Sequence, residues 1–88
     1  MSQSMPEMPE PSLEVILSTF ATQAAVALGQ VPNPVTQKTE TDLEQAKYAI
    51  DLLQVLEEKT KGNRNESEEA LLTDVLYKLR MIYIDAKK

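Results

Sequence analysis

One stretch, residues 13–28, constrains the fold of this chain more than any other. It reads LEVILSTFATQAAVAL and carries a single charge, Glu14, near its start. Ser12 before it is a residue type that caps helices, and Gly29 after it is a residue type that ends them. We therefore predict a helix over 12–28. Because a solvated helix normally carries Lys or Glu, we expect this one to be covered on nearly all sides.

The predicted first helix has two different faces when its residues are placed at about 100° per residue. The larger side chains gather on the face that we expect in the core: Leu13, Ile16, Leu17, Phe20, Ala24, Ala27 and Leu28. The opposite face is uncharged and consists of β-branched residues: Val15, Thr19, Thr22 and Val26. Such a face suits close packing against another helix, so we assign these four residues to a candidate interface.

A long connection and a second helix follow. Residues 29–41 contain Pro32 and Pro34, which favour extended or turn geometry. The connection is long enough to return the chain to either end of a bundle, or to place the first helix on a neighbouring subunit. The spacing of Thr41 and Glu44 is that of a capping box, and it predicts a helix over 42–61, with Thr39 as an alternative start.

A short turn leads to the third helix. Gly62 is typical of a residue just past a helix end, and Asn65 with Glu68 resembles a capping box that starts a helix over 66–86. So short a turn predicts an antiparallel hairpin. The third helix has a wide apolar stripe for the core: Leu71, Leu72, Val75, Leu76, Leu79, Ile82 and Tyr83. A second, narrow stripe has no evident partner within three helices: Ala70, Tyr77, Met81 and Ile84.

The expected fold class is therefore all-α, a three-helix bundle in which the second and third helices form an antiparallel hairpin. Residues 1–11 contain three prolines and are predicted to be a disordered tail, while residues 12–86 form a single helical domain. A chain of 88 residues has a small core, and two apolar surfaces are left over, so we predict a homo-oligomer, most simply a dimer.

Arg80, beside the narrow stripe, is either an interface anchor or a side chain whose stem covers the core edge.

The composition excludes several kinds of chemistry. The chain has neither histidine nor cysteine, and so lacks the usual general base, the usual zinc ligands and any thiol. Its net charge of -5 disfavours nucleic acid, and the one basic cluster, Lys59, Lys61 and Arg64, lies beside several glutamates. Both glycines stand at predicted helix ends rather than in a phosphate-binding loop. We expect no catalytic residues, no cofactor, no metal site and no nucleic-acid binding, and therefore no enzyme.

The sequence also bears on location and role. Polar residues interrupt the most apolar run, so no membrane span is expected, and no basic region precedes that run as in a secretory signal. We therefore expect a cytoplasmic protein. The favoured function is a protein-interaction or scaffolding module that binds an unknown protein partner through helical surfaces. The alternative is binding of an apolar small ligand or a membrane surface by the first helix.

Several runs between Ser12 and Ile84 carry a family resemblance. The more specific ones are Pro32-Asn33-Pro34, Ile50-Asp51-Leu52-Leu53, Glu58-Lys59-Thr60-Lys61-Gly62-Asn63 and Leu79-Arg80-Met81-Ile82-Tyr83. In these runs the chain resembles a bacterial family of small proteins known only as a domain of unknown function (number eighteen forty-four). The resemblance implies a bacterial, helical, cytoplasmic protein. It brings no catalytic or ligand-binding residues.

Overall fold

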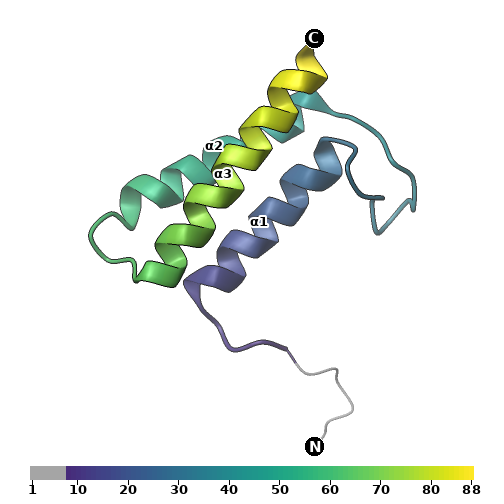
Figure 1. Cartoon of the computed structure of the whole chain (residues 1–88). Helices are drawn as coiled ribbons and strands as arrows, with labels where there is room; N and C mark the ends of the chain where they lie inside the picture. The colour runs from purple at the N-terminus through teal and green to yellow at the C-terminus, as the bar shows by residue number, and fades with distance from the viewer. Residues whose placement is uncertain (1–7) are drawn as a thin grey trace, which may run out of the picture.

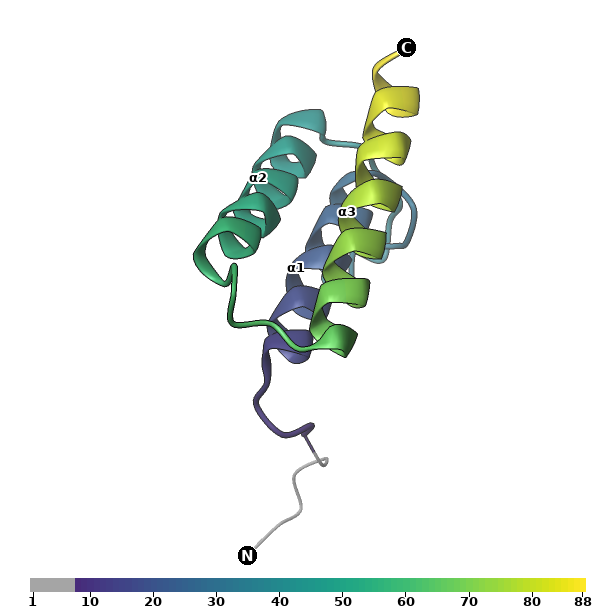
Figure 2. The ribbon, with the colours of Figure 1, turned by 60° about the vertical axis from the view of Figure 1, so that its left-hand side comes forward.

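The computed structural model describes residues 8–88 and contains three helices (Figure 1). They are α1 (Leu13–Ala27), α2 (Leu43–Lys59) and α3 (Glu66–Lys87). α1 and α3 run in the same direction and α2 runs opposite to both (Figures 1 and 2). The predicted all-α bundle with an α2–α3 hairpin is therefore confirmed. Most of the predicted disordered tail lies outside the described residues.

The first and third helices, α1 and α3, begin at the caps that the sequence predicts. The Ser12 side chain accepts a hydrogen bond from the backbone N–H of Val15 at 3.2 Å, which fixes the first turn of α1. At the start of α3, the Asn65 side chain accepts from the Glu68 N–H at 2.8 Å, and the Glu68 carboxylate accepts from the Asn65 N–H at 2.9 Å. Two backbone donors that the helix itself leaves free are satisfied in this way.

The prediction that Thr41 caps the second helix is wrong. Asp42 is the cap, and its carboxylate accepts a hydrogen bond from the Gln45 N–H at 3.1 Å. Thr41 instead forms an isolated antiparallel bridge with Leu28. Because this bridge holds the Thr41 backbone extended, Asp42 is the first residue that can turn into the helix.

The same bridge closes the long connection and settles where α1 packs. The Asp42 N–H donates to the Ala27 carbonyl at 2.7 Å, so the connection leaves and returns at one end of the bundle. α1 therefore packs on α2 of its own chain. Gly29, at a φ of +75°, makes the turn possible, since a Cβ at that position would lie 2.7 Å from the Thr41 hydroxyl oxygen.

The second helix ends two residues earlier than predicted. Thr60 follows its last residue, and the Thr60 hydroxyl donates to the Leu56 carbonyl at 2.6 Å. Gly62 has a φ of +84° and reverses the chain toward α3. The first helix is one residue shorter than predicted at each end, and α3 begins where predicted.

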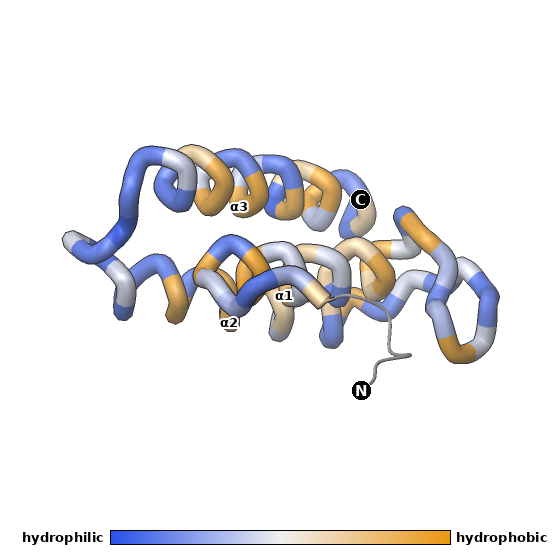
Figure 3. Tube along the Cα trace, turned by 90° about the horizontal axis from the view of Figure 1, so that it is seen from below, coloured by the Kyte–Doolittle hydropathy of each residue, from blue (hydrophilic) through white to orange (hydrophobic). Residues whose placement is uncertain are grey.

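The core lies where α3 covers one side of the α1–α2 pair (Figure 3). Each helix contributes residues at helical spacing: Leu17, Ala24 and Leu28 at α1, then Ala46, Ala49, Ile50 and Leu53 from α2, and Leu72, Leu76 and Leu79 from α3. Small alanines on α1 and α2 let these two helices approach closely. The arrangement turns one face of α3 inward and leaves the opposite face outward.

Candidate interaction surfaces

The outward face of α3 carries the narrow apolar stripe. We call Ala70, Tyr77, Met81 and Ile84 the α3 outer stripe. Tyr77 is 65% exposed, Met81 46% and Ile84 51%, and Ala70 is also exposed. These side chains point away from α1 and α2, so the packing of residues 8–88 leaves them open to solvent. Large apolar side chains that share one exposed face indicate an interaction site, whereas single exposed ones are common on protein surfaces.

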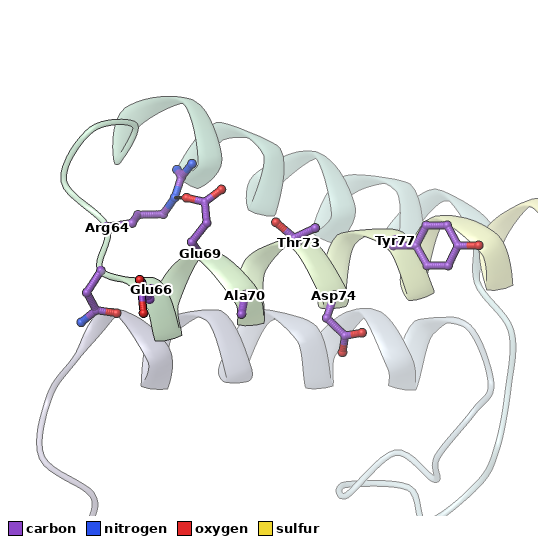
Figure 4. A pocket seen from close by; sticks show the side chains of 8 residues that line it. Arg64, Glu66, Glu69, Ala70, Thr73, Asp74 and Tyr77 are labelled. Atoms are coloured by element: carbon purple, nitrogen blue, oxygen red, sulfur yellow. Dashed lines mark hydrogen bonds and ion pairs between the residues drawn. The ribbon is translucent and has the colours of Figure 1, made fainter.

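The two ends of the α3 outer stripe differ in the size of their side chains. Ala70 is small, and the surface beside it forms a shallow, open hollow that extends from the α2–α3 turn to Tyr77. Figure 4 shows Glu69 and Thr73 on the α2 side of this hollow and Asp74 on the α1 side. At the other end, the larger side chains of Met81 and Ile84 are about half exposed. The stripe therefore has a small residue at one end and large apolar residues at the other, with Tyr77 between them.

Arg80 lies at the α2 edge of the α3 outer stripe. Its Nη2 donates to the Gln54 Oε1 of α2 at 3.4 Å, and both side chains are exposed. The structure thus gives Arg80 a contact within its own chain, across the hairpin. Its position next to the stripe keeps it at the rim of any surface that docks there.

The other candidate interface residues lie on the outer face of α1. Thr19 and Thr22 are exposed, and Val15 and Val26 are half-buried. The Thr19 hydroxyl donates to the Val15 carbonyl at 2.8 Å, and the Thr22 hydroxyl donates to the Ser18 carbonyl at 2.9 Å. Both hydroxyl protons are therefore used inside the helix, which makes this face less polar than its composition suggests.

A groove between α1 and α2 continues this outer face. It encloses about 610 Å³ on the side away from α3, and its lining includes Thr22, Val26, Pro34, Val35, Tyr48 and Leu52. Ile16 of α1 is 44% exposed, which corrects its predicted place in the core. Ile16 sits at the edge of the α1 core face, and the packing of the three helices covers it only in part. The groove is not among the features predicted from the sequence, although the wide apolar arc of α2, with Tyr48 and Val55 at its edges, indicates a surface of this kind.

Arg64 has a role that the sequence analysis did not anticipate. Its side chain is only 9% exposed, and its Nε donates to a Glu69 carboxylate oxygen at 2.8 Å. Its Nη1 donates to the Glu57 carbonyl at 2.6 Å and to the Thr60 hydroxyl at 3.0 Å. Arg64 therefore fastens the end of α2 to the start of α3. The predicted basic cluster is correspondingly weaker, because one of its three cations is already paired.

The other ion pairs among residues 8–88 are exposed, and each joins residues about one turn apart. Lys47 donates to Asp51 at 2.8 Å, one turn away on α2. This hydrogen bond, with the charge of Asp51 second, raises the pKa of Lys47. Within residues 8–88, no three acidic side chains gather closely enough to hold a metal ion. No helix in that part of the chain has both the length and the apolar character needed to cross a bilayer.

Comparisons with known proteins identify a family. A family model described as a domain of unknown function, DUF1844, matches residues 10–85. Neither the search of curated proteins nor the search of solved structures finds a match. The family match spans all three helices and the connections between them, so the chain belongs to the DUF1844 family.

Proposed function

We propose that this protein is a non-enzymatic, cytoplasmic interaction module that assembles as a homodimer through the α3 outer stripe. The observation that supports the proposal is the exposure of Tyr77, Met81 and Ile84 on one face of a helix whose opposite face is fully packed. A closed, two-fold contact is the commonest way for identical chains to cover such a face. In the dimer, the α1–α2 groove of each subunit stays free for a further protein partner.

Molar mass in solution tests the proposal. The chain has a mass of 9.9 kDa, and we expect light scattering at micromolar concentration to give twice that value. Met81→Glu places a charge in the middle of the stripe and should yield a monomer, because the carboxylate would have to be desolvated in the contact. A wild-type protein that stays monomeric at these concentrations contradicts the proposal.

Val55→Glu is the matched control. Val55 is 49% exposed, close to the value for Met81, but it lies on α2 and away from the α3 outer stripe. The same substitution at Val55 should therefore leave the molar mass unchanged. Glu44→Lys, at the start of α2, serves as a second control for charge alone. Circular dichroism of each variant checks that the helices are retained.

The α1–α2 groove favours a second candidate function, binding of an apolar small ligand. Its volume is in the range of small-molecule sites, and Val26, Tyr48 and Leu52 supply apolar lining. The fluorescence of an apolar naphthalenesulfonate dye reports on it. Tyr48→Glu should abolish dye binding if the groove is the site. Dye fluorescence that is absent from the wild type, or unchanged by the substitution, rejects this candidate.

A further inference from the structure

The α3 outer stripe is self-complementary about Tyr77, and we infer that two copies of the chain pair through it with their α3 helices antiparallel. The inference rests on the proposed homodimer and adds its geometry. Ala70 and Ile84 lie seven residues before and after Tyr77, so all three recur on one helix face. When two such helices run antiparallel with the two-fold axis at Tyr77, Ala70 of each copy faces Ile84 of the other.

The shape of the stripe fits this arrangement. The open hollow beside Ala70, bordered by Thr73 and Asp74, leaves room for a large side chain of a second copy. Ile84, half exposed at the other end, is such a side chain. Antiparallel pairing places Ile84 of each copy over Ala70 and the hollow of the other, while Tyr77 meets Tyr77 at the centre. Parallel pairing would place hollow against hollow and isoleucine against isoleucine, which leaves voids at one end.

The charges along α3 favour the same direction. Its first turn contains three glutamates: Glu68 caps the helix, Glu69 binds Arg64, and Glu66 is left on the outer side. Its end carries Lys87 and Lys88, with the Lys88 Nζ 3.7 Å from the Asp85 carboxylate. An antiparallel pair sets the acidic start of each α3 against the basic end of the other. A parallel pair would set acidic against acidic and basic against basic. The helix dipoles also favour opposite ends side by side.

The flank of the stripe nearest α1 is complementary in the same way. Asp74 and Lys78 lie on this flank, one turn apart, and form an exposed ion pair at 3.2 Å. They are almost centred on Tyr77 along the helix. In an antiparallel pair the same flanks of the two helices meet, so Asp74 of one copy comes beside Lys78 of the other. The second copy is therefore the occupant whose shape and charge the stripe matches.

Engineered cysteines test the direction, because the native chain contains none. Tyr77→Cys should form a disulfide-linked dimer under mild oxidation. Ala70→Cys alone and Ile84→Cys alone should remain largely unlinked. In the antiparallel pair, each of these cysteines lies about 21 Å along the helix axis from the same cysteine of the other copy. An equimolar mixture of the last two variants should form the mixed disulfide, identified by mass spectrometry. Circular dichroism checks that each variant keeps its helices.

The outcomes separate the inference from the proposed homodimer. Efficient linking of Ala70→Cys to itself and of Ile84→Cys to itself would show parallel pairing and overturn the inference while the homodimer stands. A wild-type dimer in which none of the variants links, whether alone or mixed, places the contact elsewhere and also overturns it. A wild-type monomer by light scattering removes the homodimer itself.

Charge exchange gives an independent readout of the same geometry. Glu66→Lys should weaken dimerisation about threefold, since it sets a lysine beside Lys88 of the second copy, and surface pairs have effects of this order. Adding Lys88→Glu to the same chain should restore the wild-type dissociation constant. If the double variant dimerises no better than Glu66→Lys alone, the antiparallel pairing is wrong.

Discussion

Two faces of α3 carry apolar side chains, but their surroundings differ. The inner face presents Leu72, Leu76 and Leu79, which α1 and α2 bury almost completely. The outer face presents Tyr77, Met81 and Ile84, which remain about half exposed. Hydrophobic spacing identifies both faces as apolar, but it does not say what covers each of them. The inner face is covered by the chain itself, and we attribute the cover of the outer face to a second copy.

The largest predicted effect separates the two faces by stability. Leu76→Ala removes a fully packed side chain and should lower the free energy of unfolding by about 3 kcal/mol at every protein concentration. Tyr77→Ala, the adjacent residue on the outer face, should cost less than about 1 kcal/mol once the protein is dilute enough to be monomeric. Urea denaturation followed by circular dichroism measures both. Equal losses in dilute solution would mean that the two faces do not differ as described.

The next largest predicted effect on stability concerns Arg64 in the α2–α3 turn, which holds α3 with its inner face toward the core. Arg64→Met keeps most of the side-chain volume but removes the bonds to Glu57, Thr60 and Glu69. Because hydrogen bonds from a charged group are stronger than neutral ones, we expect a loss of about 1–2 kcal/mol in the free energy of unfolding. Lys61→Met, in the exposed part of the turn, should change it little. Similar losses for both variants would contradict the fastening role of Arg64.

The smallest predicted effect on stability comes from the Lys47–Asp51 pair, on the polar edge of α2 that borders α3. The hydrogen bond to Asp51 raises the pKa of Lys47 above its usual value of 10.5 in the folded protein. The contribution of this pair to stability is therefore present below about pH 10.5, where Lys47 is charged, and is lost as the pH rises further. The difference in thermal midpoint between wild type and Lys47→Met should shrink between about pH 9 and pH 12. A difference that stays constant over this interval would contradict the shift.

The features that the sequence predicted correctly depend on near neighbours in the chain. The caps at Ser12 and Asn65 join residues three positions apart, and Gly29 and Gly62 adopt positive φ where the chain turns. Helical periodicity likewise separated the buried Leu76 from the exposed Tyr77. Such signals are read within one or two turns, so they require no knowledge of the tertiary fold.

The features that were missed depend on how the chain turns and packs between its helices. Thr41 carries a good capping signal, but its bridge to Leu28, on the far side of the connection, overrides it. The composition of the turn predicts Arg64 as a surface cation, but the fold places the Glu57 carbonyl and the Glu69 carboxylate beside it. Ile16 has the spacing of a core residue, but the packing of the helices leaves it 44% exposed. The helices could therefore be predicted from the sequence, but the α1–α2 groove and the Arg64 contacts could not.

Oxidation of methionine by dilute peroxide, followed by peptide mass spectrometry, tests the cover of the outer face of α3 most directly. Met81 lies within the α3 outer stripe, and Met8, which is 77% exposed and outside the helices, is an internal reference in the same molecule. We predict that oxidation of Met81 slows relative to Met8 as the protein concentration rises through the range of dimerisation. A ratio of the two rates that does not change with concentration would contradict the claim that a second copy covers this face.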